Sequence, residues 1–161
     1  MPEASLELCF NLPVNIVWKF VSDFKNIGSC LRFVGGIEKS GESYVWKVKP
    51  PMSITTRTSV LKPEFLDRVG NKSLSWIAKG EYIQWGGRFD LENLEKKKTK
   101  AKIELEVSGL GPMSVIIDST AALQIKNQLK YFAEQIKKKL EGESITVEGS
   151  GLPFCDEEEK K

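Results

Sequence analysis

The sequence of 161 residues contains no histidine. This absence excludes histidine general bases, Ser-His-Asp and Cys-His nucleophile arrangements, and every metal site that needs an imidazole ligand. Any catalysis would therefore depend on carboxylate, Lys, Tyr, Cys or Arg side chains. We expect neither a metal ion nor another cofactor, and the sequence favours a protein that is not an enzyme.

Long hydrophobic runs and frequent cysteines are also missing. No apolar run approaches the roughly 18 residues needed to cross a bilayer, and the first residues do not show the pattern of a signal peptide. The three cysteines are Cys9, Cys30 and Cys155, and an odd number at wide spacing is not typical of a disulfide framework. We therefore expect a cytoplasmic protein whose cysteines are incidental.

Charge of one sign does not dominate, since the sequence has 24 basic and 22 acidic residues and a net charge of +2. This balance gives no reason to expect nucleic acid as a partner. Lysine clusters at 96–98 and 137–139 are interpreted as solvated surface, with transient contact to a membrane or partner protein as the alternative. A monomer and a dimer are equally compatible with the sequence.

The pattern along the chain predicts an α+β domain. Alternating apolar residues predict a first strand at 5–10. Two short helices follow at 13–21 and 23–30, the first capped by Asn11 and the second by Ser22-Asp23. Further antiparallel strands are predicted at 32–38, 43–49, 52–61, 73–79, 82–94 and 101–108. Residues 61–69 are predicted to form a turn region in which another strand starts, and Gly86-Gly87 is predicted to form a kink.

A long helix is predicted at about 113–141. Its apolar residues recur at three- and four-residue spacing, at Ile117, Ala121, Ile125, Leu129, Phe132, Ile136 and Leu140. This is the only predicted element large enough to cover the apolar face of the sheet. We expect one domain over residues 1–141 and a flexible polar tail over 142–161.

This order of elements resembles the START-like or helix-grip (SRPBCC) superfamily. There an apolar strand leads into a proline-led helix that ends in a Val-Trp pair and an Asp, as Pro13, Trp18 and Asp23 do here. The likeness covers about residues 5–141 in architecture, although its motif is short. It implies structural rather than catalytic roles for Trp18 and Asp23.

Within the superfamily, the chain looks nearest to the G-subunit family of carbon monoxide dehydrogenase. In those relatives the second helix runs into Cys-(Ile/Leu)-Pro-Gly, and here Cys30-Leu31 fits whereas Arg32-Phe33 replaces Pro-Gly. Family members are associated with maturation or membrane recruitment of molybdenum hydroxylases. The resemblance therefore implies an accessory protein of this kind.

The superfamily resemblance also implies a curved antiparallel sheet of about six to seven strands around the long helix. The cavity between them would bind a lipid, an isoprenoid, a polyketide or another small apolar ligand. Aromatic side chains with a few hydroxyl groups suit such a pocket, although each could instead be ordinary core. The predicted ligand-binding residues are Phe33, Trp46, Met52, Thr56, Thr58, Trp76, Tyr82, Trp85, Phe89, Met113, Ile117 and Ala121.

Two other functions stay open beside a carrier of apolar ligands. An enzyme of the polyketide cyclase or aromatase type would need a polar group inside the cavity, with Tyr82, Arg88 and Asp90 as candidates. Alternation of the strand, however, predicts that Arg88 faces the surface. A cochaperone-like interaction module would instead have a filled core and a large exposed apolar patch on the outer face of the sheet.

Overall fold

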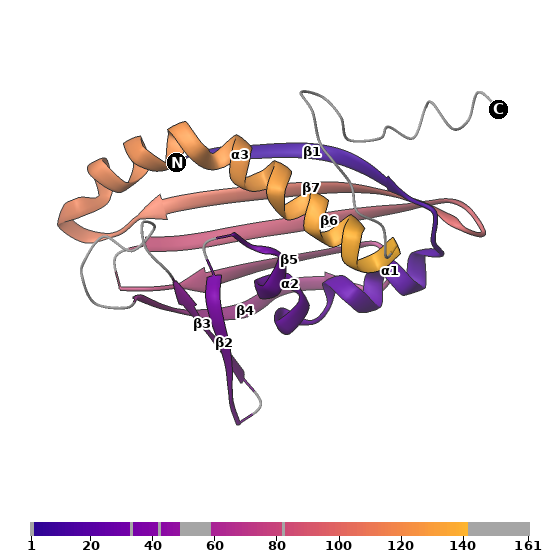
Figure 1. The fold of residues 1–161 in the computed structure, drawn as a ribbon, viewed down its shortest axis with the longest axis horizontal. Helices are drawn as coiled ribbons and strands as arrows, with labels where there is room; N and C mark the ends of the chain where they lie inside the picture. The colour runs from indigo at the N-terminus through magenta and orange to yellow at the C-terminus, as the bar shows by residue number, and fades with distance from the viewer. Residues whose placement is uncertain (1, 33, 42, 49–58, 82, 142–161) are drawn as a thin grey trace.

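A computed structural model of the chain describes residues 2–32, 34–41, 43–48, 59–81 and 83–141. It confirms the α+β helix-grip fold. A curved seven-stranded antiparallel sheet, in the order β1-β7-β6-β5-β4-β3-β2, lies against the long helix α3 (Ser114–Glu141) (Figure 1). The predicted tail at 142–161 lies outside the described residues.

The remaining elements follow the predicted order. The strands are β1 (Glu3–Phe10), β2 (Val34–Ser40), β3 (Ser43–Val48), β4 (Ser59–Val69), β5 (Ser73–Lys79), β6 (Ile83–Glu95) and β7 (Lys98–Gly109). Two short helices, α1 (Val14–Val21) and α2 (Phe24–Cys30), follow β1, and a 3-10 turn, η1 (Gly111–Met113), precedes α3. The register of β2 with β3 shifts between Val34 and Gly36, at the Gly35-Gly36 pair.

The caps of the two short helices follow the prediction only in part. Asp23 caps α2 as expected, because its Oδ1 accepts a hydrogen bond from the Lys25 amide at 2.9 Å. The predicted cap of α1 at Asn11 is wrong, since α1 begins after Pro13. The Asn11 amide instead donates to Glu141 Oε2 at 2.8 Å, which ties the end of β1 to the end of α3.

Residues 61–69 form a strand rather than the predicted turn region. They belong to β4, which pairs with β5 from Lys62 to Val69. The pairs between β3 and β4 end at Trp46 and Leu61, so the following half of β4 is a sheet edge among the described residues. Proline is tolerated at such an edge, which explains how Pro63 fits within the strand.

The predicted kink at Gly86-Gly87 is also wrong. Both glycines keep the register of β6 with β5 and with β7, and the shift in β6 lies further on, between Asn93 and Glu95. Gly87 instead leaves space for the indole ring of Trp76.

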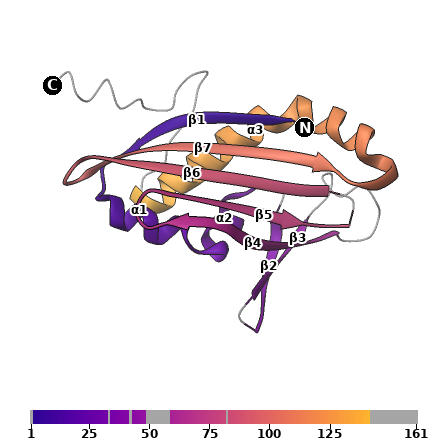
Figure 2. The ribbon, with the colours of Figure 1, turned by 180° about the vertical axis from the view of Figure 1, so that it is seen from behind.

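The hydrophobic core lies between the inner face of the sheet and α3. Figure 2 views the sheet from its outer face, with α3 behind it. The predicted stripe on α3 is buried from Ile117 to Ile136, and Leu140 packs against its end. The backbone of α3 packs most closely against β7 and β1 and stands further from β4, β5 and β6.

A buried polar cluster fastens the C-terminal end of α3 to the end of β1. Lys137, only 4% exposed, donates to the Cys9 carbonyl oxygen and lies 3.2 Å from Glu141 Oε2. Glu141 in turn accepts from the Asn11 amide. The charge of Lys137 is therefore paired and hydrogen-bonded inside the protein, as burial requires.

Candidate ligand-binding interior

The structure brings together the predicted ligand-binding residues that it describes with their side chains. Trp46, Trp76, Trp85, Phe89, Ile117 and Ala121 are all buried in the one core between sheet and helices. Met113 ends η1. Phe33, Met52, Thr56, Thr58 and Tyr82 lie outside the described residues. Contact of these residues with a ligand stays a prediction.

An aromatic cluster fills the end of the interior that α2 covers. The Trp46 indole donates from Nε1 to the Phe24 carbonyl oxygen at 3.2 Å and meets the Trp76 ring edge-on, with centroids 5.5 Å apart. Phe24 stacks on Phe65 at 4.0 Å. A Cβ on Gly28 would lie 2.5 Å from Trp46 Nε1, so α2 approaches this ring closely because of the glycine. This part of the interior is packed core.

Trp76 extends from β5 across the neighbouring strand β6. A Cβ on Gly87 would lie 2.5 Å from Cε2 and 2.6 Å from Nε1 of the Trp76 indole. Gly87 thus leaves the space in which the ring lies, which is a known use of glycine within a strand. The ring is 1% exposed, and its Nε1 has no hydrogen-bond partner among the described residues.

Gln128 is a second polar group in the interior, and the sequence analysis missed it. It lies on α3 between Ile125 and Phe132 at helical spacing, is 9% exposed, and its Oε1 has no hydrogen-bond partner among the described residues. A buried polar atom without a partner costs about 1–3 kcal/mol, so such atoms are uncommon in native proteins. The placement of Gln128 within an otherwise apolar stripe was the available signal.

The charged residues named for an enzyme face away from this interior. Arg88 Nε lies 3.0 Å from Asp90 Oδ2, and this hydrogen bond raises the pKa of Arg88. Their side chains are 43% and 36% exposed, which confirms the predicted surface position of Arg88. Tyr82 lies outside the described residues.

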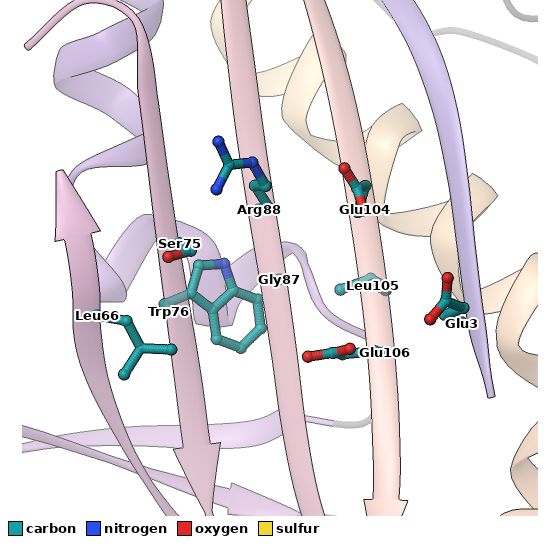
Figure 3. Close-up of a pocket in the computed structure, with 9 residues that line it drawn as sticks. All are labelled: Glu3, Leu66, Ser75, Trp76, Gly87, Arg88, Glu104, Leu105 and Glu106. Carbon is teal, nitrogen blue, oxygen red and sulfur yellow. The ribbon is translucent and has the colours of Figure 1, made fainter. Parts of the chain in front are cut away.

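The outer face of the sheet carries a small pocket of about 160 Å³. Figure 3 shows its lining side chains, which come from five strands and include Arg88, Glu104 and Glu106. A larger groove of about 530 Å³ lies where the β2–β3 hairpin separates from β4, beside Asp23, Tyr44 and Phe65. Of the predicted ligand-binding residues, Trp76 lines the small pocket, and none lines the larger groove.

Cysteine and metal chemistry contribute little to the interior. Burial raises the pKa of the Cys30 thiol to about 11, so it is a poor nucleophile near neutral pH. Cys9 is bonded in a disulfide, which corrects the expectation that all cysteines are incidental. The described residues contain no cluster of three or more potential metal ligands.

No helix in the described part of the chain is both long enough and apolar enough to cross a membrane.

Comparisons with known proteins agree with this architecture at the level of the fold. No family model and no curated protein matches the sequence. Among solved structures, a conserved protein from Geobacillus kaustophilus is similar with a TM-score of 0.67 and 18% identity, over 87% of this chain and 94% of that one. A START superfamily protein from Mycobacterium smegmatis has a TM-score of 0.64 and 14% identity, over 87% and 97% of the two chains.

A third similar structure is the Zhui aromatase/cyclase from Streptomyces sp. R1128. Its TM-score is 0.66 at 8% identity, over 94% of this chain and 98% of that one. Identities this low establish a shared fold and leave function to the residues of each chain. The chain therefore has the START-like helix-grip fold.

Proposed function

We propose that this protein binds or carries a small apolar ligand between its sheet and α3, without catalysing a reaction. The observation that carries the proposal is the composition of the inner wall. The helix α3 lies closest to β7 and β1. On β5 and β6, which lie further from α3, the inner wall is formed by the large rings of Trp76, Trp85 and Phe89. Burial of apolar ligand surface against such rings would supply most of the affinity.

The fold supports this proposal. Two proteins of similar fold are described as a START superfamily protein and as an aromatase/cyclase. The finer role, an accessory or maturation factor like those of the carbon monoxide dehydrogenase G-subunit family, remains part of the proposal on the strength of Trp18, Asp23 and Cys30-Leu31. A lipid, an isoprenoid and a polyketide-like molecule all fit this proposal, as does transient contact with a membrane or partner protein.

A cyclase-type enzyme is the alternative, and the described interior offers little chemistry for it. The buried polar or charged residues in the described part are Thr99, Gln128 and Lys137. Thr99 Oγ1 donates to the Leu12 carbonyl oxygen at 2.8 Å, and Lys137 is paired at the far end of α3. None of the three is a free acid or base beside the aromatic wall.

An interaction module is the other alternative. It predicts a large apolar patch on the outer sheet face, but that face carries ion pairs such as Lys100–Glu7 and Lys102–Glu104 along β1 and β7. Large exposed apolar side chains include Leu66, which lines the outer-face pocket from β4, and Val115 and Leu123 in the N-terminal half of α3. A carrier therefore agrees better with the described surface.

Native mass spectrometry of protein purified from its own source, followed by denaturing extraction, tests the proposal. We expect an apolar molecule bound near one-to-one, released only on unfolding. A consistently unliganded mass, together with no binding of added fatty acid, isoprenoid alcohol or aromatic polyketide, would contradict the proposal.

A further inference from the structure

Two polar atoms in the interior lack hydrogen-bond partners among the described residues, and their chemistry is complementary. Trp76 Nε1 carries a hydrogen and can only donate, whereas Gln128 Oε1 can only accept. Both side chains are more than nine-tenths buried, at 1% and 9% exposed. Buried polar atoms in native proteins nearly always have hydrogen-bond partners, and the exceptions are expected at functional sites.

The fold places the two atoms in the same part of the interior. Phe132 of α3 contacts Phe89 of β6, with ring centroids 5.9 Å apart. Gln128 precedes Phe132 by one helical turn, about 6 Å along α3, and Gly87 precedes Phe89 by two residues, about 7 Å along β6.

The two displacements point in the same direction. The Gly109 amide donates to Asp118 Oδ1 at 2.7 Å, and Gly109 pairs with Ile83, so the N-terminal part of α3 lies near the start of β6. Gln128 and the Trp76 indole over Gly87 therefore both lie on the same side of the Phe89–Phe132 contact.

We propose that this pair recognises a hydroxyl group on the apolar ligand, with Trp76 Nε1 donating a hydrogen bond to the hydroxyl oxygen and Gln128 Oε1 accepting a hydrogen bond from the hydroxyl O–H. The inference rests on the proposed function and narrows its ligand class to alcohols and phenols. A hydroxyl is the smallest group that both accepts and donates, so one oxygen satisfies both atoms.

The surrounding charges disfavour an anionic ligand group at this position. Of the buried residues described, only Lys137 is cationic, and it is occupied by Cys9 and Glu141 at the C-terminal end of α3. A carboxylate or phosphate buried beside Trp76 and Gln128 would have no counter-charge, which is strongly unfavourable. A neutral hydroxyl carries no such cost.

Isothermal titration calorimetry with 2-naphthol and naphthalene tests the inference, because these probes differ by one hydroxyl group. The intact chain should bind 2-naphthol about tenfold or more tightly than naphthalene, the preference expected when buried polar atoms gain partners. Gln128→Met removes the side-chain amide group and Trp76→Phe removes the indole N–H, and both leave an apolar side chain in place. Each variant should lose the preference, so that its affinities for 2-naphthol and naphthalene lie within about threefold of each other.

Gln124→Met is the matched control, since Gln124 lies one turn earlier on α3 and is only partly buried; this variant should keep the full preference. Equal binding of the two probes by the wild type would overturn the inference and leave the proposed function standing. A preference that survives in both Gln128→Met and Trp76→Phe would overturn it as well. If the wild type binds neither probe, the inference fails, whereas the proposed function fails only if the purified protein carries no ligand and fatty acid, isoprenoid alcohol and aromatic polyketide also do not bind.

Discussion

Replacing Gly87 with alanine tests how the interior wall is built. The new Cβ would lie 2.5 Å from two indole carbons of Trp76 and 2.6 Å from its Nε1. Carbon atoms in contact prefer about 3.5–4.0 Å, so the rigid ring would have to move by about 1 Å. The ring has little room, because its edge-on contact with Trp46 is itself buried. Overpacking of this kind costs about 1–3 kcal/mol.

Gly86→Ala provides a matched control one residue away. There the Cβ would meet Oε1 of Glu106 at 3.0 Å and its Cγ at 3.1 Å, on a flexible side chain of the outer face that has to shift by only a few tenths of an ångström. Alanine also fixes the strand backbone slightly better than glycine, by about 0.5–1 kcal/mol. Gly86→Ala should therefore leave the free energy of unfolding unchanged or raise it slightly.

Urea denaturation followed by tryptophan fluorescence measures both variants. Gly87→Ala should unfold at a lower urea concentration, with a free energy of unfolding about 1–3 kcal/mol below that of the wild type. Its thermal midpoint should be about 2–4 °C lower for each kcal/mol lost. Equal stability of the two variants would refute the placement of the Trp76 ring over Gly87.

Three further predictions concern buried polar groups. Lys137→Met should lower the free energy of unfolding by about 3–5 kcal/mol, because it leaves the Glu141 carboxylate buried without its cation; a loss below about 1 kcal/mol in urea denaturation would contradict this. Gln128→Met should raise the same quantity by about 1 kcal/mol, since an unpaired buried oxygen is removed; a clear loss of stability would mean that this oxygen has a partner. Cys30, with a pKa raised to about 11, should react slowly with iodoacetamide at a pH of about 8 in the native protein and rapidly in denaturant; equal rates would contradict its burial.

The sequence predicted the fold well wherever one periodicity dominated. Strict alternation identified the core of β7, and three- and four-residue spacing identified the buried face of α3. Asp23 was found as a cap because its side chain acts on the adjacent backbone, which is local information. Asn11 was misjudged because its amide is bound by Glu141, a residue distant in the chain.

The errors in β4 and β6 have the same origin in tertiary structure. Pro63 reads as a strand breaker unless the partner strand is known to end beside it, at Leu61. Gly86-Gly87 reads as a kink unless the Trp76 ring is known to cross β6 at Gly87. Both depend on neighbours in space that spacing along the chain does not reveal.

In the candidate site, too, the sequence predicted what depends on spacing along the chain and missed what depends on neighbours in space. Predicted wall residues such as Trp76, Trp85 and Phe89 lie in the interior because alternation fixes which face of a strand they occupy. Gln128 was missed because the search for apolar periodicity considered only apolar residues, and Gln128 is a polar residue within the apolar stripe. Its burial without a partner among the described residues becomes visible only when the sheet and α3 are seen together.

The most direct test of ligand binding in the interior uses the indole N–H resonances of the protein's four tryptophans. The chain would be titrated with 2-naphthol, and the signals followed by ¹⁵N–¹H correlation spectroscopy. The Trp76 indole signal should shift until it saturates, while the signal of Trp18, which lies on α1 and is only partly buried, should stay in place. A Trp76 signal that does not move at high probe concentration, or a shift confined to Trp18, would contradict ligand binding beside Trp76.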